Sequence, residues 1–73
     1  MNKKRVRSNL RALLHKYDLE QKELAEMTGL SVRTISELAN DKTVRYPKHA
    51  IEAIINALDI TDFNDILTIV DEE

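Results

Sequence analysis

The hydrophobic residues of this chain recur at helical spacing along most of its length. Apolar side chains three and four positions apart lie on one face of a helix, so each such group predicts an amphipathic helix. No alternating β pattern, internal repeat or low-complexity stretch interrupts the series. The pattern therefore predicts five helices and an all-α fold. The apolar stripes are Val6, Leu10, Leu13, Leu14 and Tyr17; Leu24 and Ala25; Ile35 and Leu38; Ile51, Ile54, Ile55 and Leu58; and Phe63, Ile66, Leu67 and Val70, the last stripe following Thr61 as a helix cap.

The second and third segments, within residues 21–40, meet at Gly29, the single glycine of the chain. Glycine readily adopts the left-handed backbone that ends many helices, because it has no Cβ atom. Ser31 can accept a hydrogen bond from the free amides that open the next helix. Ala25 lies one turn before Gly29, where a larger side chain would hold the two helices apart. These features predict a helix-turn-helix whose second helix is presented outward.

A known family shows the same spacing. The chain resembles the Cro and phage-repressor type of helix-turn-helix, the Xre family, from about Leu10 to Leu67. The resemblance implies a compact five-helix, lambda-repressor-like DNA-binding domain, with the helix-turn-helix at helices 2 and 3. The family usually has glycine where Asp41 and Asp59 stand, so we expect the turn after helix 3 to shift to Asn40 and helix 4 to end differently. The matching residues are Gln21-x-x-Leu24-Ala25-x-x-Thr28-Gly29-Leu30-Ser31-x-x-Thr34-Ile35-Ser36-x-Leu38, then Asn40-Asp41-Lys42-Thr43, Pro47 and Ile51-x-x-Ile54-x-x-Ala57-Leu58.

The outward face of the helix that follows Gly29 holds the candidate base-reading residues. Arg33 is the strongest, because a guanidinium can bond both O6 and N7 of guanine, a contact worth roughly 1–3 kcal/mol of discrimination. Glu37 can accept from a cytosine amino group, or it can merely pair with Arg33 four residues away. Val32 and Thr34 lie at the edges of this face, where a methyl group can contact thymine or a hydroxyl can contact phosphate. The full set is Val32, Arg33, Thr34, Ser36 and Glu37.

The expected phosphate contacts surround this helix. The resemblance places Gln21 at the start of helix 2, where its amide can donate to a phosphate oxygen beside the free amides of the helix N-terminus. It also places the start of helix 1 near the DNA backbone, where Arg7 or Arg11 can touch phosphate. The phosphate candidates are Gln21, Ser31, Asn40, Lys42, Arg45 and Arg11, with Arg7 and Lys48 as further possibilities.

The net charge is −2, but the positive and negative residues are distributed unevenly along the chain. Residues 1–17 contain six cations and no acid, whereas residues 51–73 contain seven acids and no lysine or arginine, and end in an acidic tail at 71–73. This asymmetry predicts a dipolar molecule, with one end that meets phosphate and another that stays away from it. A basic start and an acidic end that serve only solubility are the alternative.

Several kinds of protein are excluded. There is no cysteine for a disulfide or a thiolate metal site, and His15 and His49 have no second metal ligand at suitable spacing. A single glycine cannot form a phosphate-cradling loop, and no nucleophile–base pair is evident. We therefore expect a single domain, 1–73, that is not an enzyme and takes no metal, cofactor or small-molecule ligand. No apolar run approaches the roughly 20 residues that span a membrane, and the N-terminus lacks a signal peptide, so the chain is expected to be cytoplasmic.

The leading hypothesis is a sequence-specific transcriptional regulator that binds double-stranded DNA. The resemblance implies a repressor that binds a near-palindromic operator as a homodimer, with helix 3 of each copy in a major groove. The alternative is a protein-binding helix-turn-helix module, such as an antitoxin-like partner, which would use the acidic C-terminal half. Ile69 and Val70, near the acidic end, suggest either a patch for a second subunit or a tail packed on its own domain.

Overall fold

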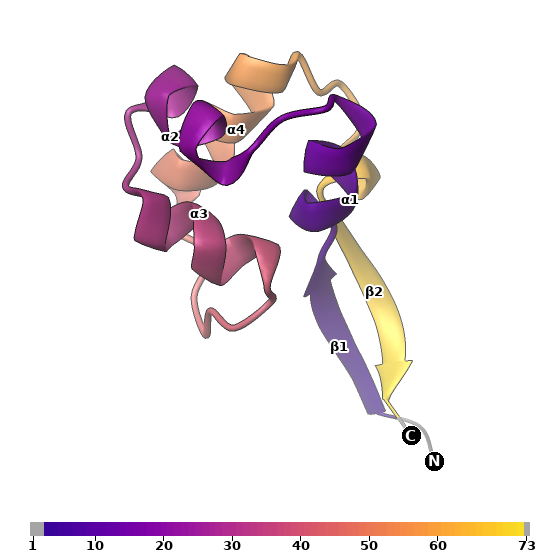
Figure 1. The fold of residues 1–73 in the computed structure, drawn as a ribbon. Helices are drawn as coiled ribbons and strands as arrows, with labels where there is room; N and C mark the ends of the chain where they lie inside the picture. Colours follow the sequence, from indigo (N-terminus) through magenta and orange to yellow (C-terminus); the bar gives the residue numbers. More distant parts are fainter. Residues whose placement is uncertain (1–2, 73) are drawn as a thin grey trace.

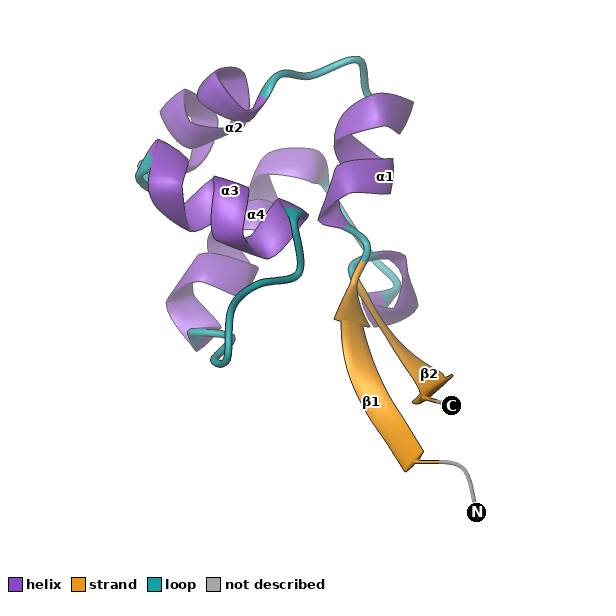
Figure 2. Ribbon diagram, turned by 60° about the horizontal axis from the view of Figure 1, so that its bottom comes forward, coloured by secondary structure: helices purple, strands orange, loops and turns teal. Residues whose placement is uncertain are grey.

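Residues 3–72, which the computed structural model describes (for Glu72 the backbone alone), form four α-helices, one 3₁₀ turn and a two-stranded antiparallel sheet. The helices pack together, and the sheet projects from them as a ribbon made from the two ends of the chain (Figure 1, Figure 2). The elements in order are β1 (Lys3–Ser8), α1 (Leu10–Lys16), α2 (Gln21–Thr28), α3 (Val32–Ala39), α4 (Lys48–Leu58), η1 (Phe63–Asp65) and β2 (Leu67–Glu72).

The core consists of aliphatic side chains from all four helices and from the turn before β2. Leu24 of α2, Ile35 of α3 and Ile54 of α4 have no exposed surface, so the helix-turn-helix and α4 share one apolar centre. Leu10 and Ile66 are each 1% exposed and close the core at the end from which the ribbon leaves. The helical spacing thus predicted most of the core between residues 10 and 58, but Tyr17, which was expected in the first stripe, is 42% exposed, and the buried Ala50 was not predicted.

The first predicted helix is shorter than expected. Val6 belongs to β1, and α1 begins only at Leu10, where the Ser8 hydroxyl oxygen accepts a hydrogen bond from the Leu10 amide at 3.2 Å. Four cations lie between residues 3 and 7, and positive charge is unfavourable at a helix N-terminus because the helix dipole is positive there. In a strand, these side chains reach solvent on both faces and can face acidic residues of a neighbour.

The fifth predicted helix does not form, so the expectations of an all-α fold and of five helices are wrong. Residues 63–65 make a 3₁₀ turn capped by Asp62, whose carboxylate accepts from the Asn64 amide at 3.0 Å; Thr61 is not the cap. The next residues, Leu67–Glu72, form β2. Three consecutive β-branched residues, 68–70, favour a strand, and pairing with β1 satisfies their backbone groups. The predicted acidic tail is therefore in part strand, and residue 73 lies outside the described residues.

The ribbon also overturns the expected separation of charge. In its register Lys3 pairs with Glu72 and Lys4 with Asp71, so the basic beginning and the acidic end of the chain lie side by side. The Lys4 Nζ atom is 3.1 Å from Asp71 Oδ1, although 67 residues separate the two in sequence. Opposite charges facing each other across an antiparallel pair stabilise the pairing.

Two turns keep the conformation that the family builds with glycine, although aspartate stands there. Asp41 has φ 56° and Asp59, which ends α4, has φ 53°, both left-handed. Asn40 has φ −92°, so the expected shift of the corner to Asn40 is wrong, as is the expected change at the end of α4. Aspartate is one of the few residues with a side chain that adopt this conformation at modest cost.

Asp41 ties the ribbon to the helices. Its carboxylate accepts hydrogen bonds from the Ser8 amide at 3.1 Å, from Arg5 Nη2 at 3.2 Å and from the Tyr46 hydroxyl at 3.0 Å. Burial raises the pKa of Tyr46 above its ordinary value of 10.0, and the hydrogen bond to Asp41 and the charge of Asp41 raise it further, against an opposing effect of Arg5. The contacts with Ser8 and Arg5 hold the loop after α3 against β1, and the contact with Tyr46 joins two residues of that loop.

Replacing Tyr46 with phenylalanine should therefore lower the free energy of unfolding by about 1 kcal/mol, because Asp41 loses one partner. Since folding raises the pKa of Tyr46, its contribution is complete below pH 10.0 and is lost as the pH rises through the folded-state value. Urea unfolding of Tyr46→Phe measures this loss. The control is Tyr17→Phe, which changes an exposed tyrosine. Equal stability of the two variants would contradict the prediction.

Candidate functional site

The corner between α2 and α3 is built by Gly29 and Ser31. Gly29 has φ 76° and ends α2, where its amide donates to the carbonyl of Ala25 at 2.9 Å. The Ser31 hydroxyl then accepts from the Thr34 amide at 3.1 Å and caps α3. A Cβ atom at Gly29 would meet nothing within 4 Å, so the requirement for glycine comes from the backbone alone. The predicted helix-turn-helix over residues 21–40 is confirmed, with Ala25 buried at 7% exposure.

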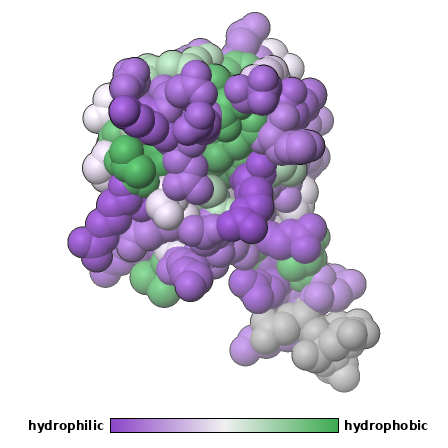
Figure 3. All heavy atoms as spheres, viewed as in Figure 1, coloured by the Kyte–Doolittle hydropathy of each residue, from purple (hydrophilic) through white to green (hydrophobic). Residues whose placement is uncertain are grey.

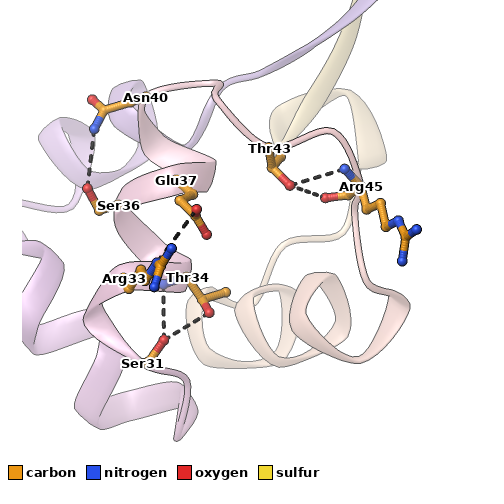
Figure 4. Close-up of polar contacts among 8 residues, drawn as sticks. All are labelled: Ser31, Arg33, Thr34, Ser36, Glu37, Asn40, Thr43 and Arg45. Carbon is orange, nitrogen blue, oxygen red and sulfur yellow. Dashed lines mark hydrogen bonds and ion pairs between the residues drawn. The ribbon is translucent and has the colours of Figure 1, made fainter.

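The outward face of α3 carries the predicted base-reading residues. Ile35 and Leu38 face the core, whereas the side chains of Arg33 and Glu37 are 88% and 51% exposed. Arg33 Nε lies 3.8 Å from Glu37 Oε2, so the two form an exposed ion pair in the free protein (Figure 4). Such a pair contributes at most about 1 kcal/mol, and both side chains remain able to turn to a ligand.

The other predicted residues of α3 differ in their exposure and in whether their side chains have hydrogen-bond partners within the protein. Val32 is 48% exposed at the first turn. The half-buried Thr34 hydroxyl accepts from Ser31 at 2.9 Å, and the Ser36 hydroxyl accepts from Asn40 Nδ2 at 3.3 Å (Figure 4). Arg33 and Glu37 are therefore exposed and paired only with each other, whereas Thr34 and Ser36 are held by neighbouring side chains.

A basic hollow lies beside the C-terminal end of α3. Arg11 of α1 donates to the Asn40 side chain, which in turn donates to Ser36, so three of the predicted residues form one chain of hydrogen bonds. Next to them is an open hollow of about 670 Å³ whose lining includes Arg7, Arg11, His15 and Asn40, together with one acid, Asp41, which is paired with Arg5. The arrangement brings two guanidinium groups to one concave surface, which suits an anionic group such as phosphate.

The cations of the loop after α3 occupy a separate place. Lys42 and Arg45 are exposed, and the Thr43 hydroxyl oxygen accepts from the Arg45 amide at 3.2 Å. Figure 4 shows the Arg45 guanidinium directed away from Arg33, with Thr43 between Arg45 and α3. Gln21 is half-buried at the first position of α2, as predicted. The structure thus joins Arg11 to Asn40, but it does not place Arg45 beside the exposed face of α3.

The sequence matches the family model described as a Cro/C1-type HTH DNA-binding domain over residues 9–72. The chain belongs to this family. Searches of curated proteins and of solved structures found no significant match. Family membership confirms the resemblance to Xre-type regulators. It assigns the chain to the general class of DNA-binding regulators.

In this Cro/C1-type domain, two features of the site escaped the sequence-based prediction. Arg7 reaches the hollow from a strand rather than from a helix, and Asp41, which also lines the hollow, accepts hydrogen bonds from Ser8 and Arg5 of the ribbon. The sequence offered one signal, the aspartate at a usual glycine position, but its partners at Ser8 and Arg5 are 33 and 36 residues away. Such distant pairing cannot be read from local spacing.

The surface of the domain agrees with a polar ligand on the α3 side. Hydrophilic residues cover most of the face seen in Figure 3, which includes α3.

Among residues 3–72, no three His, Cys, Asp or Glu side chains are placed to hold a metal ion. No helix in the same range has the length and hydrophobicity needed to cross a membrane.

Proposed function

We propose that this Cro/C1-type domain is a sequence-specific transcriptional repressor that places α3 in the major groove of DNA. It binds a near-palindromic operator as a homodimer, so that two copies of α3 enter successive major grooves about 34–36 Å apart. The observation that carries the proposal is the exposed polar face of α3 beyond the Gly29 corner, with the Arg33 side chain 88% exposed.

Base reading is assigned to that face. Breaking the exposed Arg33–Glu37 pair costs at most about 1 kcal/mol, whereas a bidentate contact of arginine with guanine is worth about 1–3 kcal/mol of discrimination. Exchanging Glu37 for a guanine therefore lowers the free energy of Arg33, and Glu37 then becomes free to accept a hydrogen bond from a cytosine amino group. The base-reading set is Val32, Arg33, Thr34, Ser36 and Glu37.

Phosphate binding is assigned to positions around α3. Arg11 is held by Asn40 beside the basic hollow, so its guanidinium is oriented before DNA arrives. Gln21 and Ser31 lie at the starts of α2 and α3, where free amides attract anions. The exposed cations of the 40–46 loop complete the set, which is Gln21, Ser31, Asn40, Lys42, Arg45 and Arg11.

Selection of bound sites from random duplex DNA tests the proposal. We expect one enriched sequence with two-fold symmetry, and an affinity that falls steeply between about 50 and 200 mM salt, by about 10³–10⁵ for 6–10 phosphate contacts. Failure to enrich any sequence, with weak dependence on salt, would favour the protein-binding module instead. Enrichment of a sequence without two-fold symmetry would contradict the homodimeric mode alone.

Lys42→Ala and Arg45→Ala should each weaken binding to all DNA sequences alike. Because a phosphate contact carries no sequence information, each change should reduce the slope of log K against log salt by about one unit and leave the selected sequence unchanged. Fluorescence anisotropy at several salt concentrations measures the slope. Lys16→Ala, an exposed cation at the end of α1, is the matched control. A slope equal to that of the control would remove Lys42 or Arg45 from the interface.

A further inference from the structure

The basic hollow beside α3 contains one acidic side chain. Its charged lining is Arg7 from β1, Arg11 from α1 and Asp41 from the loop after α3. His15, also in the lining, adds positive charge only when it is protonated. Among the described residues, neither guanidinium of the hollow is paired with a carboxylate. The Asp41 carboxylate is therefore the group that would oppose the approach of a phosphate, because like charges repel.

Both carboxylate oxygens of Asp41 have hydrogen-bond donors. Oδ1 accepts from the Ser8 amide at 3.1 Å and from the Tyr46 hydroxyl at 3.0 Å. Oδ2 accepts from Arg5 Nη2 at 3.2 Å, and Arg5 is the charged donor among the three. The Asp41 side chain is 21% exposed, so solvent screens its charge less than it screens a fully exposed carboxylate. Arg5 thus compensates the charge of Asp41, whereas Ser8 and Tyr46 supply neutral hydrogen bonds.

Arg5 and Arg7 lie on the same face of β1 but have different partners. Side chains two positions apart on a strand point to the same side of the sheet. Arg5 reaches the loop after α3, which lies next to β1 (Figure 1, Figure 2), whereas Arg7 lines the hollow. The pairing of Arg5 with Asp41 therefore fixes the strand from which Arg7 projects. The same contact compensates the negative charge that lies beside Arg7 in the hollow.

Tyr46 is subject to the opposing effects of the same two charges. Burial is the largest cause of its raised pKa, and the hydrogen bond to Asp41 and the charge of Asp41 raise that pKa further. The charge of Arg5 lowers the pKa of Tyr46. Arg5 and Asp41 thus act on a neighbouring group in opposite directions, as charge compensation requires.

We propose that Arg5 is a positioning residue for DNA binding, which holds and compensates Asp41 so that the two guanidinium groups of the hollow can receive a DNA phosphate. The inference rests on the proposed function, because it concerns the DNA contacts of the same site. Arg5 stays on Asp41 in the complex and touches no phosphate itself. Aspartate stands here where the family usually has glycine, so the compensating arginine accompanies a departure of this chain from the family pattern.

A double-mutant cycle of Arg5→Gln and Asp41→Asn tests this role by fluorescence anisotropy with a mixed-sequence duplex of about 20 base pairs at several salt concentrations. Phosphate contacts do not depend on base sequence, so this duplex serves before any operator is known. Asparagine tolerates the left-handed backbone at residue 41, where φ is 56°, so the second change keeps the turn.

The effect of Arg5→Gln should depend on Asp41. We expect binding to weaken by about 10-fold when Asp41 is present, and by less than about 2-fold in the Asp41→Asn background. In that background, the slope of log K against log salt should be the same with and without Arg5→Gln, because no phosphate contact is lost.

Three further variants separate charge from folding. Arg5→Lys keeps the charge, and the Asp41 contact uses one Nη2 atom, so binding should stay within about 3-fold of the parent. Tyr46→Phe removes a hydrogen bond to Asp41 but no charge, so affinity should change by less than about 2-fold. Lys4→Gln is the matched control, because Lys4 lies on the other face of β1 and pairs with Asp71 at 3.1 Å. Circular dichroism establishes that each variant is folded.

The outcomes separate this inference from the proposed function. Equal losses from Arg5→Gln in both backgrounds overturn the inference and make Arg5 a phosphate contact, while the proposed function stands. An unchanged affinity of Arg5→Gln also overturns it, as does an equal loss in Arg5→Lys, Tyr46→Phe or Lys4→Gln. A loss that requires Asp41 supports the inference even where site selection enriches no DNA sequence, and only the sequence-specific function then fails. A parent that binds no duplex at about 50 mM salt overturns both.

Discussion

A Gly29→Val variant is expected to lose about 2–4 kcal/mol of unfolding free energy. A left-handed backbone costs a residue with a Cβ atom about 1–2 kcal/mol, and valine adds the strain of a branched side chain that is stiff at χ1. The loss is a large part of the stability of a domain of 73 residues, which is on the order of 4–11 kcal/mol. Thermal unfolding should show a decrease in melting temperature of about 10–30 °C.

Other substitutions at Gly29 separate backbone strain from crowding. A Cβ atom at Gly29 has no neighbour within 4 Å, so Gly29→Ala should cost only the backbone term, about 1–2 kcal/mol. Gly29→Asp should cost less than Gly29→Val, since three aspartates of this chain, Asp18, Asp41 and Asp59, already adopt φ near the value for Gly29. A valine variant that melts within a few degrees of the parent would refute the requirement for glycine.

The second large effect is expected at Arg33. Arg33→Ala should weaken operator binding by about 1–3 kcal/mol and relax the preference at one base pair, because a guanine loses its bidentate partner. The side chain is 88% exposed and its ion pair with Glu37 is weak, so the stability of the free protein should change by less than about 1 kcal/mol. Binding to a panel of operators with single base changes measures the lost preference.

Two further variants make the assignment of Arg33 specific. Arg33→Lys keeps the charge but lacks the planar fork, so affinity should partly survive while the preference for guanine is lost. Glu37→Ala tests whether Glu37 reads a base or only pairs with Arg33 in the free protein. If Arg33→Ala binds the same selected sequence with undiminished preference, the base-reading role of α3 is wrong.

The candidate site was largely predictable from sequence, because it is local. Gly29, Ser31 and Arg33 lie within a few residues of one another, and their positions at a turn, at a cap and on one exposed helical face follow from local geometry. Each of these features is determined by short-range backbone geometry. The end of α4 is equally local but was predicted wrongly, because Asp59 replaces the usual glycine without changing the left-handed conformation.

The errors at the two ends of the chain have a common physical cause. The apolar spacing at Val6 and from Phe63 to Val70 is typical of a helix, but it carries no information about which distant segment each stretch pairs with. Residues 3–8 and 67–72 are strands because each satisfies the backbone groups of the other, and charge pairs such as Lys4 with Asp71 add to the pairing. A preference for β structure depends on neighbours in space, and here those neighbours are at opposite ends of the sequence.

By itself, the sequence determined the helix-turn-helix, the aliphatic core and the exposed polar face of α3, since each depends on side chains within one or two helical turns. Only the tertiary structure decided the ribbon and the contacts by which Asp41 joins it to the loop after α3. Each of these arises where segments that are distant in sequence meet, and such meetings are decided by burial and backbone pairing over the whole chain rather than by local spacing.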